Sequence, residues 1–560
     1  MEILGLHPAI WLTLAAYFAA MILMGWVARK KVHDQDSYLL GGRVFNTWYM
    51  VMHAFGAGTN PGDVAGVVSK TAERGASGVW ISWMWLFGTP FYWVIAPIVR
   101  RLRAVTMADY FEQRYGGYSS VLYVLLATLG MTMCLASVLL ATTRTVQGMM
   151  GKAGGPDADM WFFGILFVST SVFVIYGFFG GIIAAIKTDM VQGIMIIFLS
   201  CLAIPAALNM PELGGWSGVK DILRNASTEN ADYLSIVGTG SFDIWNLILL
   251  SISAPLTALA LPHLSSVCGS GKTEWESRVG FATGNYLKRV CTLGWCVLAL
   301  CWMAWLIKTG TEIHPDAAFG DSVRSLLNPF LQGIMLACVL AAAMSSGDAF
   351  QITVSGLFSN NIYKRFLKPD ASEAHLLAVT RWGGVVVVAM SLMVAILYRN
   401  NMVSSIMDYF RILGFTGITI AVGIVWRRMN GAGVYVGLLS AAACFLVLRY
   451  GNIQVDPKMV TGFPLFAGIV GSVIGSLCTK PTDPERVDMF LKRIYTPIGQ
   501  EDRLECSLEE VVPLSDRLLT AGGLFIVKPT RQTWMGFVLY MALCVACVLA
   551  LLLIIGGWQV

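Results

Sequence analysis

Long apolar runs separated by short polar segments dominate the pattern of this chain. About 20 consecutive apolar residues form a helix that can cross the hydrocarbon core of a bilayer, and runs of this kind recur along the whole sequence. The pattern predicts an all-α polytopic membrane protein with about fourteen transmembrane helices. The runs are centred near Ala16, Gly56, Phe87, Met131, Val168, Met195, Pro255, Val297, Ala342, Val388, Thr416, Leu439, Ile469 and Val545.

Lysine and arginine residues are concentrated in alternate loops between these runs. Cytoplasmic loops of membrane proteins carry an excess of these residues, so we expect the basic loops to face the cytoplasm and both termini to lie outside. The longest of the basic loops, 480–532, includes an amphipathic stretch and is predicted to lie at the membrane interface. Examples from the basic loops are Arg29, Lys30, Lys31, Arg43, Arg100, Arg101, Arg103, Lys364, Arg365, Arg427 and Arg428.

The composition agrees with a membrane protein and argues against several other classes. Of the 560 residues, 56% are hydrophobic and 13% are charged, against about 25% charged in soluble domains. The net charge of +5 lies mainly in loops and does not indicate nucleic-acid binding. The twelve cysteines are scattered through apolar runs, so we interpret them as core residues. The chain has neither a Walker A pattern nor a paired nucleophile and base, so we expect a transporter driven by an ion gradient and not an enzyme.

A polar interruption divides the second apolar run. Residues 53–66 read H-A-F-G-A-G-T-N-P-G-D-V-A-G. Glycine leaves helical geometry easily and proline removes a backbone donor, so the run should break here and leave free carbonyl and N–H groups at bilayer depth. Such groups are tolerated where they line a cavity, and secondary transporters use them to bind ions and solutes. We therefore favour a binding site over a simple kink.

The ninth run contains a second unusual stretch, Leu340 to Asp348. Ser345 and Ser346 offer hydroxyl oxygens for a cation, and an aspartate inside a membrane helix is a candidate functional residue. The alternative for the serines is small-residue packing, with each hydroxyl bonded to the preceding turn. Asp189, near the start of the sixth run, has two open interpretations. It is either a helix-end charge paired with Lys187 or a second site for a cation that leaves inward.

Six segments, taken in order, resemble the sodium:solute symporter family, which includes proline, sugar, pantothenate and sialic acid transporters. The resemblance extends over about residues 38 to 484. The segments are YLLGGR at 38–43, TMADYFEQRYG at 106–116, IYGFFGG at 175–181, TDMVQ at 188–192, AMSSGD at 343–348 with NIYKRF at 361–366, and WRRMNGAG at 426–433.

The resemblance implies a leucine-transporter-type core of two five-helix inverted repeats. The first repeat would cover 45–209 and the second 243–428, within a single membrane domain. An extra helix at 7–28, accessory helices at 431–479 and 533–556, and the cytoplasmic loop at 480–532 would complete it. The second repeat would begin with the seventh run, where Pro255, Pro262 and His263 suit a matching broken helix.

The resemblance also implies a sodium site between the second and ninth runs. Carried over by position, its ligands are backbone carbonyls of the break and oxygens of the ninth run. Asp189 matches the residue that the family associates with sodium exit or a second sodium, and Asp348 stands where members with that second site have a serine. The sodium ligands implied are Gly56, Thr59, Ala342, Ser345 and Ser346.

The solute is expected beside the same break, with the lipid bilayer as surroundings. Each candidate residue has a structural alternative: His263 at a helix break, Lys288 at the cytoplasmic start of its helix, Arg411 paired with Asp408, and Trp85 as a packing residue. The solute-binding candidates are Asn60, Asp63, Ser82, Trp85, His263, Lys288 and Arg411.

The sequence therefore predicts sodium-coupled symport of a small organic solute into the cell by alternating access, in the cell membrane, with sodium as the co-transported ion. One alternative is a proton-coupled or uncoupled carrier, in which Asp63, Asp189 and Asp348 hold protons. Another is a membrane sensor built on a symporter fold. Such a sensor would carry a long signalling domain, whereas this chain ends soon after its last apolar run.

Overall fold

The computed structural model describes residues 5–28, 35–227, 232–451 and 454–556, and it is almost entirely helical. The long helices are α1 (Pro8–Ala28), α8 (Gly117–Met149), α9 (Ala158–Cys201), α14 (Glu274–Thr309), α16 (Pro329–Phe358), α17 (Glu373–Leu397), α18 (Met402–Val425), α19 (Gly431–Tyr450), α20 (Pro457–Leu477) and α23 (Arg531–Ile555). The shorter elements are α2 (Gln35–Leu40), α3 (Thr47–Gly58), α4 (Pro61–Arg74), α5 (Trp80–Trp83), α6 (Thr89–Arg101), α7 (Ala108–Tyr115), α10 (Ile204–Leu208), α11 (Gly215–Ala226), α12 (Ile244–Ala260), α13 (Leu264–Gly269), α15 (Ala318–Leu326), α21 (Pro484–Tyr495), α22 (Leu508–Val511), β1 (Arg517–Leu519) and β2 (Ile526–Val527).

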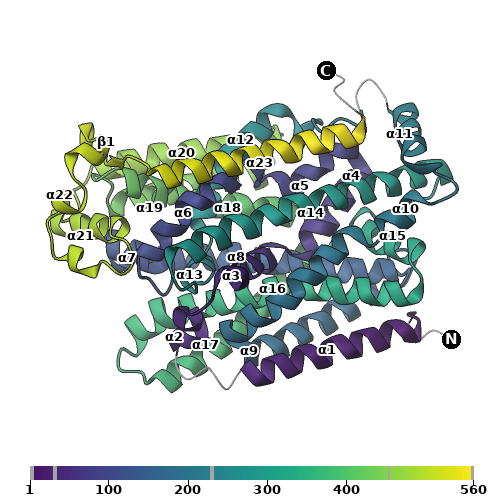
Figure 1. Ribbon diagram of the computed structural model, residues 1–560, viewed down its shortest axis with the longest axis horizontal. Helices are drawn as coiled ribbons and strands as arrows, with labels where there is room; N and C mark the ends of the chain where they lie inside the picture. Colours follow the sequence, from purple (N-terminus) through teal and green to yellow (C-terminus); the bar gives the residue numbers. More distant parts are fainter. Residues whose placement is uncertain (1–4, 29–34, 228–231, 452–453, 557–560) are drawn as a thin grey trace.

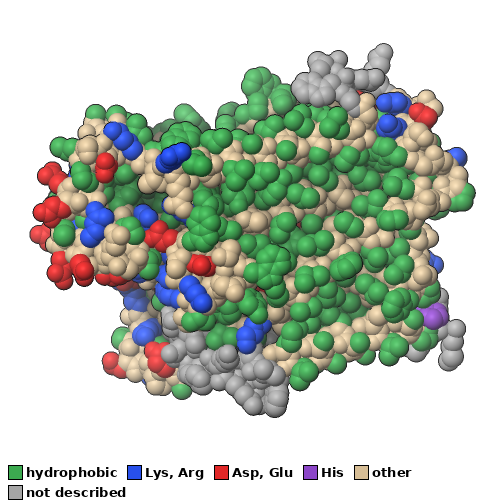
Figure 2. Space-filling model, in the orientation of Figure 1, with side chains coloured by type: hydrophobic (Ala, Val, Ile, Leu, Met, Phe, Trp, Pro, Cys, Tyr) green, Lys and Arg blue, Asp and Glu red, His purple; other side chains and the backbone are tan. Residues whose placement is uncertain are grey.

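The long helices lie side by side along one axis of the molecule (Figure 1). Helices α11 and α15 lie at one end of the bundle, which we call the α11 end. Helices α21 and α22 and the small antiparallel pair β1–β2 lie at the other, which we call the α21 end. Hydrophobic side chains cover most of the visible face between the two ends, and charged side chains gather mainly at the α21 end (Figure 2). This distribution is that of a protein embedded in a bilayer.

The described residues contain ten helical stretches that are long and apolar enough to cross a membrane, with three shorter apolar helices besides. The predicted count of fourteen spans is not confirmed. One reason is that α3 and α12, the first halves of the two broken helices, are too short to register as complete spans. Another is that the run centred near Val168 registers only as the shorter helix Ala158–Ser171, whereas the run near Met195 lies in the counted stretch Ile182–Leu208; both runs belong to α9. The segment 175–181 of the family resemblance lies there, outside the residues whose side chains are described.

The second run is broken, as predicted, between α3 and α4. Thr59 and Asn60 are extended, with φ near −120°, and Pro61 starts α4, where a residue without an N–H is tolerated. The Asp63 carboxylate accepts the backbone N–H of Asn60 at 3.0 Å and caps the new helix. The interruption is therefore a built feature with its own cap, and it leaves carbonyls of the last turn of α3 unbonded within the helix.

The seventh run is also interrupted, as its prolines predicted. Helix α12 ends at Ala260, Leu261 leaves helical geometry with ψ near 116°, and α13 begins after His263. A proline within or after a helix cannot donate to the preceding turn. The chain therefore has two broken helices, α3–α4 and α12–α13, and α3 and α13 are in contact.

Helix α3 is surrounded by α14, α9 and α16, which places the first break in the interior of the bundle. The approach of α14 is especially close at Gly284. A β-carbon there would lie 2.5 Å from the carbonyl oxygen of Val51 and 2.7 Å from the backbone nitrogen of Phe55. Glycine at this position lets the two backbones meet, as small residues do at interfaces between membrane helices.

We expect Gly284→Ala to lower the stability of the protein, because the new methyl group meets backbone atoms of α3 that cannot move aside. Overpacking a close interface costs about 1–3 kcal/mol, which should lower the thermal unfolding midpoint in detergent by several degrees. Gly164→Ala is the matched control, since a β-carbon there meets nothing within 4 Å. Equal midpoints for the two variants would contradict the close packing of α14 on α3.

The segment after α20 forms a structured unit at the α21 end. Arg101 at the end of α6 binds Glu274 at 2.8 Å, and the backbone N–H of Ile498 donates to the same carboxylate at 2.9 Å. The N–H of Phe525 donates to the Val425 carbonyl at 2.7 Å, where α18 ends. The predicted amphipathic stretch is α21, in which Val487, Phe490, Leu491 and Ile494 are buried. The unit therefore joins the ends of α6, α14 and α18.

Candidate sodium and solute site

Backbone carbonyls of the first break converge on one hydroxyl of α16. The Ser346 hydroxyl oxygen lies 3.2 Å from the Gly56 carbonyl oxygen and 3.3 Å from each of the carbonyl oxygens of Ala57 and Thr59. A hydroxyl has one proton, so it can satisfy only one of the three at a time. The cluster is buried and rich in oxygen. Such a set of carbonyls and hydroxyl suits a hard cation, and the sequence predicted Gly56, Thr59 and Ser346 as part of it.

The other two predicted ligands lie on the same side of α16. Ala342 and Ser345 are buried and stand one helical turn and one residue before Ser346. The Ser345 hydroxyl donates to the Asp189 carboxylate and not to the carbonyl cluster. Gly56 makes this approach possible, because a β-carbon there would lie 2.5 Å from the Ser345 hydroxyl oxygen. The structure thus brings all five predicted sodium ligands to the contact between α3 and α16.

Asp189 of α9 is completely buried beside this cluster. Its second carboxylate oxygen lies 2.6 Å from Nδ1 of His53, which is also completely buried. Sequence reasoning did not select His53 as a functional residue. Two features of the sequence could have selected it. His53 lies three residues before Gly56, on the same face of α3, and histidine is rare in membrane helices. The interpretation of Asp189 as a helix-end charge paired with Lys187 is wrong, because Asp189 lies inside α9 and its carboxylate contacts His53 and Ser345.

Asp348 lies one turn after Ser345 on α16 and is 3% exposed. The spacing of three residues places it on the same helical face as Ser345. Ser346, Ser345 and Asp348 thus form a row of polar groups on α16. Asp348 lies at the end of this row that is nearer to the α21 end, because α16 runs in that direction to the segment Ser359–Leu367. Within the part of the chain that the structure describes, Asp189 and Asp348 are therefore acidic residues next to the candidate cation site.

A small cavity of about 50 Å³ lies beside the first break. Four of the predicted solute-binding residues line it: Asn60, Trp85, His263 and Lys288. Asn60 belongs to the break itself, and His263 belongs to the second broken helix. The cavity is therefore placed where the two interruptions meet, which is the arrangement expected of a transporter binding site.

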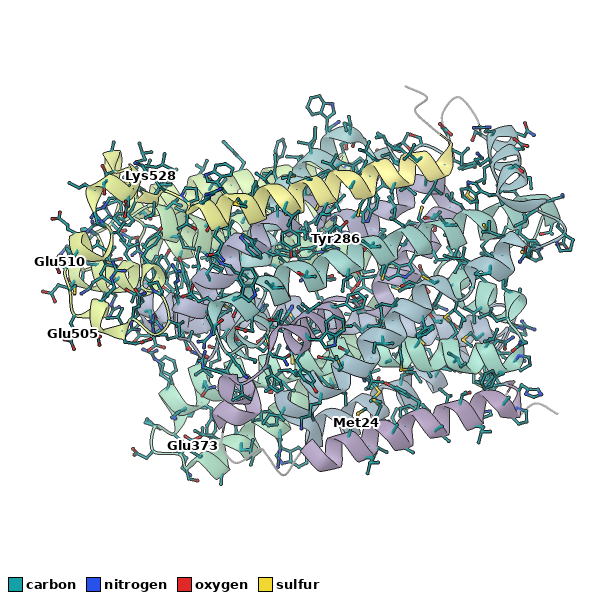
Figure 3. The ribbon with its side chains drawn as sticks, in the orientation of Figure 1. Met24, Tyr286, Glu373, Glu505, Glu510 and Lys528 are labelled. Atoms are coloured by element: carbon teal, nitrogen blue, oxygen red, sulfur yellow. The ribbon has the colours of Figure 1, made fainter. Side chains whose placement is uncertain are left out.

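Lys288 makes the strongest polar contacts at this cavity. Its ammonium nitrogen lies 2.8 Å from the Asp63 carboxylate and donates to the Gly58 carbonyl at 2.5 Å. Both side chains are buried. Tyr286 lies near the middle of the bundle's length (Figure 3), and Lys288 is only two residues, or about 3 Å of helix, further on. The alternative that Lys288 marks the cytoplasmic start of its helix is therefore wrong.

Three predicted solute-binding residues do not line this cavity. Asp63 stands behind Lys288 and caps α4. The Ser82 hydroxyl bonds to that of Thr292 at 3.0 Å, and its carbonyl accepts from Arg289, so it joins α5 to α14. Arg411 binds Asp408 at 3.2 Å, as its structural alternative proposed, and lines a different and larger cavity.

The cavity also contains residues that sequence reasoning missed, chiefly Tyr92, Tyr409 and Asn285. The tyrosines gave no signal, because an aromatic residue in an apolar run is usually a packing residue. Asn285 did give one. It stands three residues before Lys288 on α14, so the two polar groups share a face, and polar residues inside membrane helices usually face the protein interior or a cavity.

Comparisons with known sequences agree with this geometry. The sequence model of the sodium:solute symporter family matches residues 38–440. The osmoregulated proline transporter OpuE of Bacillus subtilis is 27% identical over 486 residues, which cover 83% of this chain and 94% of that protein. The sodium/proline symporter of Salmonella typhimurium is 26% identical over 502 residues, covering 86% and 95%. These relatives are transporters and not enzymes.

A solved structure, the substrate-bound outward-open state of a Na⁺-coupled sialic acid symporter, has the same fold. The TM-score is 0.68 with 17% sequence identity, over 85% of this chain and 99% of that one. The family model matches most of the chain, and the broken helix and the serine pair agree with the sodium site that the family predicts. This chain belongs to the sodium:solute symporter family and is an integral multi-pass membrane protein that carries out sodium-coupled symport of a small solute.

Proposed function

We propose that this protein couples sodium entry to uptake of a small amino-acid-like solute that carries a carboxylate. The observation that carries the proposal is the buried Lys288 ammonium, which lines the cavity beside the carbonyl cluster. Asp63 and the Gly58 carbonyl accept two of the three N–H donors of this ammonium, and the third can donate to the carboxylate of a solute in the cavity. The curated relatives named above are proline transporters, and proline is a small zwitterion with a carboxylate.

Sodium would bind at the carbonyl cluster and tie α3–α4 to α16. The Gly56 and Thr59 carbonyls, the Ala342 carbonyl and the hydroxyls of Ser345 and Ser346 supply the oxygens. On binding, the Ser346 hydroxyl turns a lone pair toward the ion and its proton away, since it can no longer donate to the same carbonyls. Five oxygens from two helices then share one cation, and this holds the broken helix in one position.

Asp189 and Asp348 would act on the inward path of the ion. The Ser345 hydroxyl is already directed at Asp189, so this carboxylate is the first negative charge that a departing cation meets. His53 holds the other oxygen of Asp189 and fixes its orientation. Whether Asp189 and Asp348 hold a second sodium or only guide the first is decided by the sodium stoichiometry of uptake.

The solute would be held between the two helix breaks. Lys288 faces the carboxylate, Asn60 and His263 offer further polar contacts, and Trp85 forms an apolar wall with its ring 4.8 Å edge-on from that of Phe410. Asp63 orients Lys288, so it acts through that residue and does not contact the solute. The present cavity of about 50 Å³ is smaller than an amino acid, and the site therefore opens or closes around the solute during transport.

Coupling requires that sodium bind one conformation more tightly than the other. We propose that the core consists of two inverted five-helix repeats, 45–209 and 243–428, which rock against each other. We further propose that the protein lies in the cell membrane with the α21 end on the cytoplasmic side and both termini outside. Sodium that joins α3–α4 to α16 would favour the outward-open state and order the solute cavity. A shift from about 1:99 to 99:1 would need a differential affinity of about 10⁴-fold.

The direct test is uptake of radiolabelled L-proline into proteoliposomes at one fixed pH. We expect an inward sodium gradient to accelerate uptake many-fold over an equal potassium gradient, because only sodium completes the five-oxygen site. A thermal-shift screen of amino acids, sugars and carboxylates, in sodium and then in potassium, identifies the solute if proline is not transported. Stabilisation of the protein by sugars alone would contradict the carboxylate proposal.

Proton coupling is the competing function, and the His53–Asp189 pair favours it. A histidine and a carboxylate 2.6 Å apart and fully buried can hold one proton between them. If a proton gradient without sodium drives uptake as fast as a sodium gradient does, this pair and not the carbonyl cluster is the coupling site.

A further inference from the structure

A second cavity, of about 650 Å³, lies where α4 and α19 end and where α18 and α20 begin. It is within the size range of small-molecule binding sites and more than ten times larger than the cavity beside the first break. It lies toward the α11 end, since the first N–H of α18, at Met402, donates to Asp316 just before α15. We call it the basic vestibule. Its charged lining residues among those described are Lys70, Arg74, Arg411, Arg449 and Asp408.

The charges of the basic vestibule do not balance. Lys70 is neutralised by Glu73 at 2.6 Å. Asp408 is completely buried and is shared by Arg411 and Arg449, with contacts of 3.2 Å to each. One carboxylate can neutralise only one of the two guanidinium groups. Together with Arg74, the described lining therefore keeps an excess of about two positive charges.

Arg411 is the group that most needs a further partner. It is 8% exposed, and its Nε has no hydrogen-bond partner within the part of the chain that the structure describes. Its Nη2 contact to Thr461 is long, at 3.4 Å. A guanidinium that is buried and only partly satisfied is costly, and a carboxylate is the ligand that matches its planar donors.

We propose that the basic vestibule is a second binding site, which takes a carboxylate-bearing solute on Arg411 with Arg74 as the outer contact. The site is distinct from the sodium-linked cavity at Lys288, and the proposal rests on the charge balance of the vestibule and not on the transport function. A carboxylate bound there would make the second salt bridge that Asp408 cannot provide. It would also supply an acceptor for the Nε of Arg411.

The position of α18 connects the basic vestibule to the central cavity. Tyr409 and Leu413 of this helix line the central cavity, whereas Met407 and Arg411 line the basic vestibule. Phe410, between Tyr409 and Arg411, packs edge-on against Trp85. A solute held on Arg411 is thus separated from the central cavity by one layer of side chains. The excess positive charge of the vestibule would concentrate carboxylate-bearing molecules there, one layer of side chains away from the central cavity.

The test is calorimetric titration of the full-length protein in nanodiscs with succinate, in potassium buffer free of sodium. The absence of sodium removes the contribution of the sodium-linked site. We expect succinate to bind, the neutral analogue succinamide not to bind, and Arg411→Gln to weaken succinate binding about tenfold or more, as the loss of a charged hydrogen bond does. Ser355→Ala, on α16 and outside the lining of both cavities, should bind succinate as the wild type does.

Arg74→Gln keeps the proposal testable if Arg411→Gln fails to fold, because Arg74 is exposed and, among the described residues, its side chain has one hydrogen bond, to the Thr239 carbonyl at 3.5 Å. This variant should weaken binding several-fold. The proposal is overturned if the wild type does not bind succinate, if chloride binds as tightly as succinate, or if neither arginine variant weakens binding. Loss of binding in Ser355→Ala would show that the effect of the arginine variants is not specific to the vestibule and would also overturn it. A protein that binds succinate without sodium yet does not transport L-proline would refute the proposed solute alone.

Discussion

Ser346→Ala is expected to raise the sodium concentration for half-maximal uptake by about ten- to hundredfold. The hydroxyl stands within 3.3 Å of three carbonyls of the break, so it is the one side-chain oxygen that lies at the centre of the candidate site. Removing a hydrogen-bonding group that faces a charge costs about 1.5–3 kcal/mol, and each 1.4 kcal/mol is about tenfold in affinity. The measurement is uptake into proteoliposomes over a series of sodium concentrations at constant ionic strength.

Ser345→Ala is expected to have a different signature, because this hydroxyl is bonded to Asp189. It should also weaken sodium activation, and in addition leave one oxygen of a buried carboxylate without a donor. The control is Ser355→Ala on the same helix. Ser355 is equally buried, but its hydroxyl bonds only to the Ile352 carbonyl one turn earlier. Full sodium activation in both Ser345→Ala and Ser346→Ala would refute the assignment of the sodium site.

The break in the second run was predictable because its causes are local. Glycine and proline act on their own backbone and the preceding turn, and the structure interrupts the helix between Gly58 and Pro61. The serine pair was selected because hydroxyls in an apolar run are candidate cation ligands, and the six segments in family order then implied its role as part of a sodium site. Four of the seven solute candidates line one cavity. Sequence could select them because polar residues in apolar runs are rare and usually face the protein interior or a cavity.

The partners of these residues were not predictable. Ser345 and Asp189 are 156 positions apart, and Lys288 and Gly58 are 230 apart. The periodicity of polar residues shows which face of a helix is polar, but it does not show which turn of another helix that face contacts. The same limit explains Arg411, which sequence placed at the solute and the structure places in the basic vestibule. It also explains His53, whose role depends on a helix far along the chain.

The count of fourteen spans is not confirmed, and the reason is a different one. Counting apolar runs assumes that each run is one straight helix across the bilayer. Here α3 has 12 residues and α4 has 14, so neither half reaches the roughly 20 residues of a span, while α9 has 44. The length of an apolar run therefore does not set the length of the helix, because the chain breaks helices where it needs free carbonyls.

Lys288→Met and Asp63→Asn are each expected to abolish uptake and to destabilise the protein strongly. Each variant leaves one buried charge without its partner, since the two side chains are 2.8 Å apart and only 7% and 4% exposed. Breaking a buried ion pair in this way costs about 3–5 kcal/mol. The expected result is a large fall in the yield of monodisperse protein and in the thermal unfolding midpoint. Lys458→Met, which removes the cation of an exposed pair with Asp456, should change neither.

The double variant Lys288→Met/Asp63→Asn separates structure from transport. Removing both charges takes away the uncompensated charge, so much of the lost stability should return. Uptake should not return, because the Lys288 ammonium faces the cavity and Asp63 does not. Lys288→Arg keeps the charge with a different shape and should retain stability better than Lys288→Met. A double variant that transports at the wild-type rate would show that the pair only holds α4 to α14, and the solute carboxylate would then have to be bound by another group of the same cavity.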